Sequence, residues 1–278
     1  MTRTLMGFAV AAAAMLTIAG SLLADDARPD MILIPAGSFT MGADGVGEED
    51  ERPSHKVELS AYYIDRHEVL RGDYLKCVDA GKCKRPKGFG KRFSEPDRPV
   101  VGIDWFDATN YCEFVGKRLP TEAEWEKAAR GTDGRTYPWG NEEPTKDRGC
   151  FAWNEGRPCK PGSYPAGDSP YGVADMAGGV WEWLADVYDA SYYPRSDAKD
   201  PKGGTCEEAL AFFRKLRKEG RQGFTGSNPI PTECERVLRG GAWNYPMKGL
   251  RSSNRVHHGP DWRIKVAGVR CAASLGRP

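Results

Sequence analysis

The stretch GKRLPTEAEWEKAARG, residues 116–131, decides how this chain is organised. Thr121 and Glu124 stand at the spacing of a capping box, in which each side chain accepts a hydrogen bond from the other residue's backbone N–H. Gly131 follows the last helix-forming residue, and glycine readily adopts the left-handed backbone that ends a helix. The stretch therefore predicts a short helix that begins after Thr121 and ends at Gly131.

Two more helices are expected before this one. DWFDATNYCEFVG predicts a helix from Asp104 to Gly116. Its expected buried face consists of Ala108, Tyr111, Cys112 and Val115. GDYLKCVDAG predicts a shorter helix that Asp73 caps and Gly81 ends.

Strands are expected where apolar, β-branched and aromatic residues alternate with polar ones. Four stretches fit: MILIPAGSFTMG (31–42), KVELSAYYIDR (56–66), RVLRGG (236–241) and VAGVRCAAS (266–274). Residues 190–235 read as an insertion whose amphipathic helix, CEEALAFFRKLRKEG, lies between Cys206 and Cys234. With no repeat and no linker, the sequence predicts one compact α+β domain over residues 25–278, low in regular secondary structure.

The first 24 residues have the pattern of a secretory signal peptide: Arg3, an apolar run and small residues up to Ala24. The apolar run falls short of the roughly 20 residues that span a bilayer, so no membrane span is expected after cleavage. Cleavage removes Arg3 and no other charge, which changes the net charge from +1 to 0. Without a basic stripe, nucleic acid is not an expected partner. The protein is expected to be exported, to a periplasm or outside the cell.

Eight cysteines in an exported chain favour disulfides. Short loops suggest Cys77–Cys83 and Cys150–Cys159, and Cys206–Cys234 would close the base of the insertion. A metal site is the alternative, but no pair has the C-x-x-C spacing and the four histidines are not interleaved with the cysteines. The sequence predicts a disulfide-stapled fold.

Several motifs occur together in one order: MILIPAGSFTMG, HKVELSAYYIDRHEV, GKRLPTEAEWEKAARG, YGVADMAGGVWEW, RVLRGGAW and VRCAAS. They resemble the sulfatase-modifying-factor family, which includes the formylglycine-generating enzymes, over residues 31–274. The resemblance implies the formylglycine-generating-enzyme fold, a variant of the C-type lectin fold. It also implies a disulfide between Cys112 and Cys271.

The resemblance breaks down at the family's copper site. Formylglycine-generating enzymes hold copper(I) with two cysteines that follow the RGG motif, because soft thiolates stabilise that ion. The matching positions here are Tyr245 and Leu250, and no cysteine occurs between Cys234 and Cys271. Copper is therefore not an expected cofactor. Another branch of this fold binds iron with histidines from an extra domain, but His257 and His258 are expected in a solvated loop.

Calcium is the cofactor that the resemblance favours. The family's calcium ligands correspond to Asp175, Gly178, Val180 and Glu182, an oxygen-rich set that suits a hard cation. The alternative is that Asp175 caps a turn and Glu182 is solvated. A second family site near Asn154 lacks its partner residues.

The family's substrate groove corresponds to Trp181, Trp243, Asn244, Tyr245, Arg251 and Arg255. Arginine with aromatic residues suits a peptide, protein or glycan ligand through stacking and paired hydrogen bonds. The alternative is that these side chains pack a loop-rich core. Two functions follow: a ligand- or partner-binding module without copper, or an oxidoreductase-type tailoring enzyme that uses the same groove, as some cysteine-lacking relatives in siderophore maturation do. Formylglycine generation is the least favoured reading, and no catalytic residue is assigned.

Overall fold

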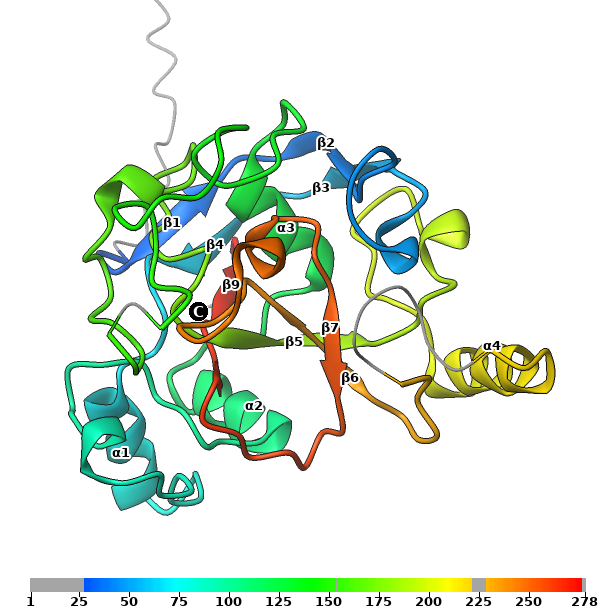
Figure 1. The fold of residues 1–278 in the computed structure, drawn as a ribbon. Coiled ribbons are helices and arrows are strands. Elements are labelled where there is room, and N and C mark those ends of the chain that lie inside the picture. Colours follow the sequence, from blue (N-terminus) through cyan, green and yellow to red (C-terminus); the bar gives the residue numbers. More distant parts are fainter. Residues whose placement is uncertain (1–27, 154, 222–228, 277–278) are drawn as a thin grey trace, which may run out of the picture.

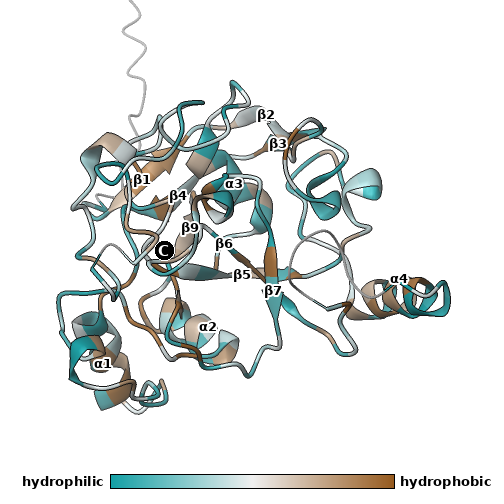
Figure 2. Ribbon diagram, viewed as in Figure 1, coloured by the Kyte–Doolittle hydropathy of each residue, from teal (hydrophilic) through white to brown (hydrophobic). Residues whose placement is uncertain are grey.

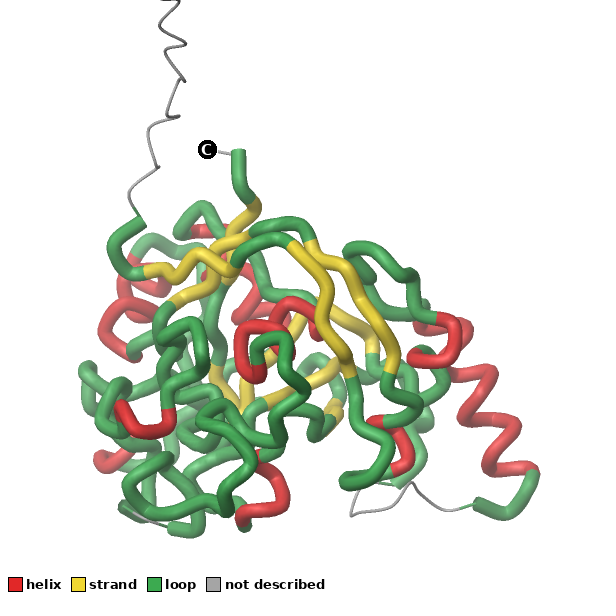
Figure 3. Tube along the Cα trace, turned by 90° about the horizontal axis from the view of Figure 1, so that it is seen from above, coloured by secondary structure: helices red, strands yellow, loops and turns green. Residues whose placement is uncertain are grey.

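The computed structural model describes residues 28–153, 155–221 and 229–276 (Figure 1). The expected signal peptide, residues 1–24, and Asn154 lie outside the described residues. Within the described ranges, no helix combines the length and the apolar character needed to cross a membrane. Helices and short strands are joined by long loops, which dominate the trace in Figure 3.

Three small sheets form the β part of the fold. In the first, β4 (Tyr62–Asp65) pairs antiparallel with β1 (Met31–Ile34) and with β9 (Ala272–Ser274), so both ends of the described chain meet in one sheet. In the second, β2 (Gly37–Met41) pairs with β3 (His55–Leu59). The third has the order β7-β6-β5-β8 and is built from β5 (Trp181–Val187), β6 (Arg236–Arg239), β7 (Val256–His258) and β8 (Ala267–Gly268).

Several expected strands are divided. The first predicted strand breaks at Pro35, which cannot donate to a ladder, and becomes β1 and β2. The second breaks at residues 60–61 into β3 and β4. The last becomes β8 and β9, which pair with different sheets. Each break lets the chain leave one sheet and enter another.

The best-predicted helix is α3 (Glu122–Arg130), where the capping box of Thr121 and Glu124 is formed. Gly131 ends the helix with a positive φ of 69°, as predicted. All nine residues of α3 are buried, because the helix is enclosed by β2, β3, β5 and β6. Figure 1 shows α3 near the middle of the molecule.

The other helices correct the sequence reading in detail. Helix α2 (Trp105–Phe114) begins one residue after the expected start, with Asp104 as its N-cap, and it ends at Phe114, so Val115 leaves the buried face and is 38% exposed. Helix α1 (Arg71–Asp79) starts after Leu70, which makes no side-chain cap. The prediction that Asp73 caps α1 is wrong: its carboxylate lies in the first turn and accepts a hydrogen bond from Lys76 at 2.7 Å.

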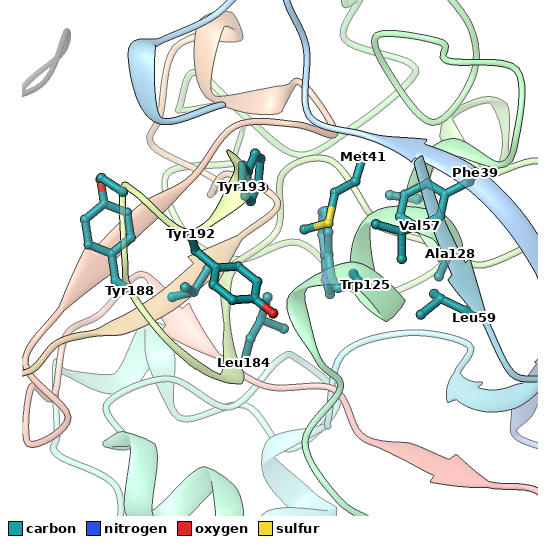
Figure 4. Close-up of a cluster of buried hydrophobic side chains, with 14 of the residues drawn as sticks. Phe39, Met41, Val57, Leu59, Trp125, Ala128, Leu184, Tyr188, Tyr192 and Tyr193 are labelled. Carbon is teal, nitrogen blue, oxygen red and sulfur yellow. The ribbon is translucent and has the colours of Figure 1, made fainter. Parts of the chain in front are cut away.

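The main apolar core surrounds Trp125 of α3. Figure 4 shows side chains from β2 and β3 on one side of Trp125 and from the segment after β5 on the other. The same core includes Ala209, Phe213 and Leu216 of α4 (Cys206–Lys218). Figure 2 shows apolar and polar residues alternating around α4, as expected for an amphipathic helix with one buried face.

All eight cysteines of the chain are paired in the four expected disulfides. These are Cys77–Cys83, Cys112–Cys271, Cys150–Cys159 and Cys206–Cys234. The Cys112–Cys271 bond spans 159 residues and ties α2 to the start of β9. In the chain-entropy model, closing a loop of that length contributes on the order of 5 kcal/mol.

The segment read as an insertion, 190–235, is integrated into the fold. Glu58 of β3 donates to the carbonyl of Ala198 at 2.8 Å and accepts from Asp200 N at 2.9 Å. Helix α4 lies at one edge of the molecule, opposite α1 (Figure 1). The insertion therefore contacts β3 through one isolated parallel bridge, between Glu58 and Lys199.

Candidate functional site

Two glycine turns bring the WEW and RGG motifs together. Gly178 and Gly179 precede β5, and Gly240 and Gly241 follow β6; all four have positive φ, which glycine adopts without a Cβ clash. Gly178 donates to the carbonyl of Gly240 at 2.7 Å, and Trp243 donates to that of Gly179 at 2.8 Å. The two motifs, about sixty residues apart in the sequence, are thus held side by side.

An aromatic cluster lies on these turns; we define it as Phe93, Trp153, Trp181, Trp243 and Tyr245. The ring of Trp243 contacts Trp153 edge-on, with centroids 4.8 Å apart, and Phe93 at 5.8 Å. Trp181 meets Tyr245 edge-on at 5.1 Å. Trp181 and Trp243 are almost fully buried, whereas Trp153 is 59% exposed. The cluster therefore has a packed base and one accessible tryptophan.

Trp153 is held in a conformation that non-glycine residues rarely adopt. Ala152 and Trp153 are consecutive and have φ angles of 49° and 64°. Ala152 donates to the carbonyl of Tyr245 at 2.9 Å, and Trp153 donates to that of Trp243 at 2.8 Å. Left-handed backbone costs about 1–2 kcal/mol per non-glycine residue. Such strain gathers where a protein fixes a side chain for function.

The two positions that the family resemblance matches to the copper thiolates are occupied by packed side chains. Leu250 is fully buried in an apolar cluster with Tyr137, Phe151 and Ala177. Tyr245 is half-buried against Trp181. Because every cysteine of the chain is in a disulfide, no thiol is available to hold copper(I) there.

The two arginines expected in the groove are engaged in ion pairs, which corrects the sequence reading. Arg251 donates to Glu51 at 2.5 Å, and its side chain is 12% exposed. Arg255 is buried and donates to both oxygens of Glu122, at 2.7 and 3.0 Å. Both guanidiniums are committed to carboxylates, and only Nε of Arg251 is left buried without a partner among the described residues, so the alternative of structural arginines is the better account.

The remaining groove candidate, Asn244, lies next to the aromatic cluster. It lies between Trp243 and Tyr245 and is half-buried. Its Oδ1 atom is buried without a hydrogen-bond partner among the described residues. An unsatisfied buried acceptor is costly, so it marks a place where a ligand or water would gain a hydrogen bond.

The expected calcium residues meet at a buried acidic cluster beside the glycine turn. Asp175 has a φ of 58°, and its Oδ2 accepts a hydrogen bond from Gly162 N at 2.6 Å. Glu182, however, uses both oxygens within the protein: Oε2 accepts from Trp125 Nε1 and Arg270 Nε, each at 2.7 Å, and Oε1 accepts from Arg270 Nη2 at 2.8 Å. Glu182 is therefore held by Arg270 rather than left open for a cation.

Glu68, which the sequence reading missed, supplies an open oxygen at this place. Its Oε1 accepts from Val180 N at 3.3 Å, whereas Oε2 is buried without a partner among the described residues. Burial, together with the Asp175 carboxylate, raises the pKa of Glu68 well above its usual value. Asp175 and Glu68 bring carboxylate oxygens, the ligand type that a hard cation prefers, to this place, whereas the oxygens of Glu182 are already engaged. Among the described residues, no three His, Cys, Asp or Glu side chains are arranged as a metal-binding group by themselves.

The two adjacent histidines are also placed differently from the sequence reading. They lie in β7 instead of a loop, and His257 is buried, stacked on Tyr188 with centroids 3.8 Å apart and paired with Glu235. His258 stacks on Trp262 at 4.4 Å, and burial lowers its pKa to about 4. These contacts account for both rings without a metal.

Comparisons with known proteins identify the family to which this chain is similar. Residues 21–275 match the family described as "Sulfatase-modifying factor enzyme 1-like domain". The chain is 34% identical over 266 residues to "Serine/threonine-protein kinase pkn1" of Chlamydia pneumoniae, covering 88% of this chain but only 38% of that protein. It is 27% identical to "Formylglycine-generating enzyme" of Bos taurus, covering 87% of this chain and 74% of that one.

Among solved structures, PvdO from Pseudomonas aeruginosa superposes with a TM-score of 0.67 at 26% identity, over 88% of this chain and 94% of that one. The match of the family model to nearly the whole described chain, with the same fold in a solved relative, leads to one conclusion. The chain belongs to the sulfatase-modifying-factor family and has the formylglycine-generating-enzyme fold.

Proposed function

We propose that this chain is an exported ligand-binding member of the family, which recognises an extended peptide or glycan through the aromatic cluster and performs no copper chemistry. One observation carries the proposal: at the copper positions, Tyr245 and Leu250 are packed side chains and every cysteine is in a disulfide. A copper(I) site needs thiolate or similarly soft ligands. What remains at this place is a surface for binding.

The surface is preorganised for stacking. Trp153 presents an exposed ring, and its strained backbone is fixed by hydrogen bonds to the RGG segment. The Cys150–Cys159 disulfide closes the same loop. Rigid aromatic anchors bind with little loss of side-chain entropy, so they contribute strongly to recognition.

Export and calcium complete the proposal. Four disulfides suit an oxidising compartment and support export. Calcium would bind at Asp175, Glu68 and the Gly178–Val180 backbone, where it would neutralise buried carboxylates. It would stabilise the turn that carries Trp181, with no part in a reaction.

Binding can be tested with immobilised glycan and peptide libraries and the purified disulfide-bonded protein. Trp153→Ala should weaken each genuine interaction by at least about tenfold, as expected for loss of a stacking anchor. Trp262→Ala is the matched control, because Trp262 is also exposed (48%) but lies outside the aromatic cluster. Ligands that bind both variants equally well would contradict the proposed surface.

The absence of copper chemistry needs its own test. The protein, loaded with copper(I) and given oxygen, should leave the thiol mass of a Cys-x-Pro-x-Arg peptide unchanged. Formation of an aldehyde would overturn this part of the proposal. A bovine-type formylglycine-generating enzyme assayed alongside confirms that the peptide and the copper are competent.

One observation keeps a second function, a tailoring enzyme, in view. The unpartnered Oδ1 of Asn244 is a buried acceptor beside the cluster, and it could hold a substrate N–H or O–H group. If so, Asn244→Ala would abolish turnover of a bound ligand while leaving its affinity within a few fold. A ligand recovered unchanged after prolonged incubation with the protein would argue against this second function.

A further inference from the structure

A second concave site lies away from the aromatic cluster and shares no residue with it. It is a cavity of about 850 Å³ between the β3–β4 turn, the first turns of α2 and α3, and the end of β9. Small-molecule sites in proteins have volumes of roughly 300–1,000 Å³. The cavity is therefore large enough for a ligand of its own, and a ligand bound at the aromatic cluster would not fill it.

Part of the wall comes from the insertion. Asp200, Pro201 and Lys202 line the cavity. They are fixed there because Ser60 donates to both oxygens of Asp200, at 2.7 Å from N and 2.8 Å from Oγ, and because Asp200 N donates to Glu58 O at 2.9 Å. The insertion thus completes a cavity that the rest of the fold would leave open on one side.

The floor is apolar. Leu59, Tyr62 and Leu119 are buried, and Ala61 and Ala185 are half-buried beside them. The ring of Trp105 forms another part of the lining, and its Nε1 already donates to Leu184 O at 2.7 Å. These surfaces suit a hydrocarbon or a ring, because covering them removes apolar area from water.

The carboxylates on the wall are already engaged. Glu124 accepts from Arg118 at 2.6 and 2.7 Å and from Thr121 N at 2.8 Å. Asp200 accepts from Ser60 at each oxygen. Arg118 therefore balances the charge of Glu124, whereas the Ser60 donors hold the two oxygens of Asp200 in place without neutralising them.

The donors on the wall are only partly engaged. Arg118 directs four N–H groups to Ser274, Leu119 and Glu124, out of the five that a guanidinium carries. Its side chain is 37% exposed. Lys202 is exposed at the rim and makes no hydrogen bond or ion pair to any residue that the structure describes. The hydrogen-bond donors that remain unused at this cavity therefore belong to two cationic side chains, Arg118 and Lys202.

We infer that this cavity is a second binding site, which takes an amphipathic carboxylate: a small molecule with an apolar chain or ring in the cavity and its carboxylate at Lys202 and Arg118. The site is independent of the aromatic cluster, so it stands whether or not that surface binds a peptide or glycan. Charge-assisted hydrogen bonds fix the head group, and the apolar lining provides most of the affinity.

Octanoate is a soluble probe for this site, with 1-octanol and octylamine as its uncharged and cationic counterparts. Calorimetric titration of the full disulfide-bonded protein should show one octanoate bound per chain, octanol bound more weakly and octylamine weakest. Lys202→Gln should weaken the binding of octanoate by about three- to tenfold, as expected for the loss of one exposed charge-assisted hydrogen bond. The affinity for octanol should not change. Lys82→Gln, at another exposed lysine, should change neither.

Filling the cavity gives an independent test. Ala61→Phe and Leu275→Trp both add volume at the lining, the second at a half-exposed position that tolerates a larger side chain. Each should abolish binding of octanoate and octanol, whereas Ala80→Phe, at the exposed end of α1, should not. Near-ultraviolet circular dichroism establishes that each variant is folded.

Three results would overturn the inference. The first is no saturable octanoate binding up to millimolar concentration. The second is binding that persists in folded Ala61→Phe and Leu275→Trp proteins, which would place the ligand elsewhere. The third is octylamine binding as tightly as octanoate, which would exclude selection for a carboxylate.

Discussion

Glu122, in the first turn of α3, accepts hydrogen bonds from Arg255 at 2.7 and 3.0 Å although the two residues are 133 positions apart. Arg255 also donates to the carbonyl of Asp50 at 2.9 Å. One buried cation therefore joins the central helix, the loop before β3 and the segment after RGG. Arg255, which the sequence analysis placed in a ligand groove, is instead a buried residue that stabilises the fold.

Arg255→Met should lower the free energy of unfolding by about 3 kcal/mol, because it removes the partner that bonds both oxygens of the buried Glu122 carboxylate and leaves only the longer 3.6 Å contact with Arg239. Adding Glu122→Gln should recover part of that loss by removing the charge. Lys76→Met, which breaks the exposed pair with Asp73, should change stability by no more than about 1 kcal/mol. Denaturant titrations of the four proteins measure these differences; equal effects for Arg255→Met and Lys76→Met would contradict the assignment.

The strained backbone next to Trp153 predicts a stabilising glycine. Ala152→Gly should raise stability by about 0.5–1 kcal/mol, since glycine adopts a φ of 49° without steric cost. Ala80→Gly, where φ is −77°, should lower stability by a similar amount. If thermal unfolding showed both variants destabilised alike, the left-handed conformation of Ala152 would be wrong.

Asp186 predicts a pH dependence of stability. Burial, and then the nearby Glu122, raises its pKa to about 8. In the unfolded chain the same carboxyl ionises near pH 4, so between about pH 4 and pH 8 only the folded state holds the proton and stability falls as the pH rises.

Asp186→Asn, which keeps an acceptor for the 2.8 Å hydrogen bond from Glu122 N, should remove this slope. The stability of this variant relative to the wild type should grow by about 1.4 kcal/mol per pH unit and level off above pH 8. Denaturant titrations at pH 5, 6, 7 and 9 follow the difference. A constant difference across that range would mean that Asp186 is ionised in the folded protein.

The disulfides should differ in their contributions according to loop length. Replacing Cys112 and Cys271 with alanine removes a 159-residue loop and should cost on the order of 5 kcal/mol; replacing Cys77 and Cys83 removes a six-residue separation and should cost about 2 kcal/mol. Urea unfolding of the two double variants measures this order. The reverse order would show that native packing, rather than chain entropy, decides the loss.

The sequence predicted local features better than distant pairings, although the local cap that it assigned to Asp73 was wrong. The capping box of α3 depends on residues three positions apart, so its pattern is visible in the sequence. Cys112–Cys271, by contrast, could be expected only from the family resemblance. The family motifs also located the aromatic cluster through Trp181, Trp243 and Tyr245, but gave no indication that Trp153 is its exposed member.

The errors in the candidate site have a common physical cause. An arginine in a sequence does not reveal whether it faces a ligand or a carboxylate, and the partners of Arg255 and Arg251 lie 133 and 200 residues away. Glu68 was missed for the same reason, since its open oxygen becomes evident only when the turn at Val180 packs on it. The motifs thus predicted where these residues lie in the fold, but not which hydrogen bonds and ion pairs their side chains make.

The Cys112–Cys271 bond also determines how the protein would respond to a pulling force. Tension applied at the two ends of the chain passes through this bond and bypasses everything between, including α3, β5, β6 and the three tryptophans of the aromatic cluster. The bypassed 159 residues would otherwise add about 550 Å of extended chain. A protein anchored at one end and pulled at the other could thus lose its outer strands, β1 and β9, while the part that carries these tryptophans stays folded inside a covalent ring.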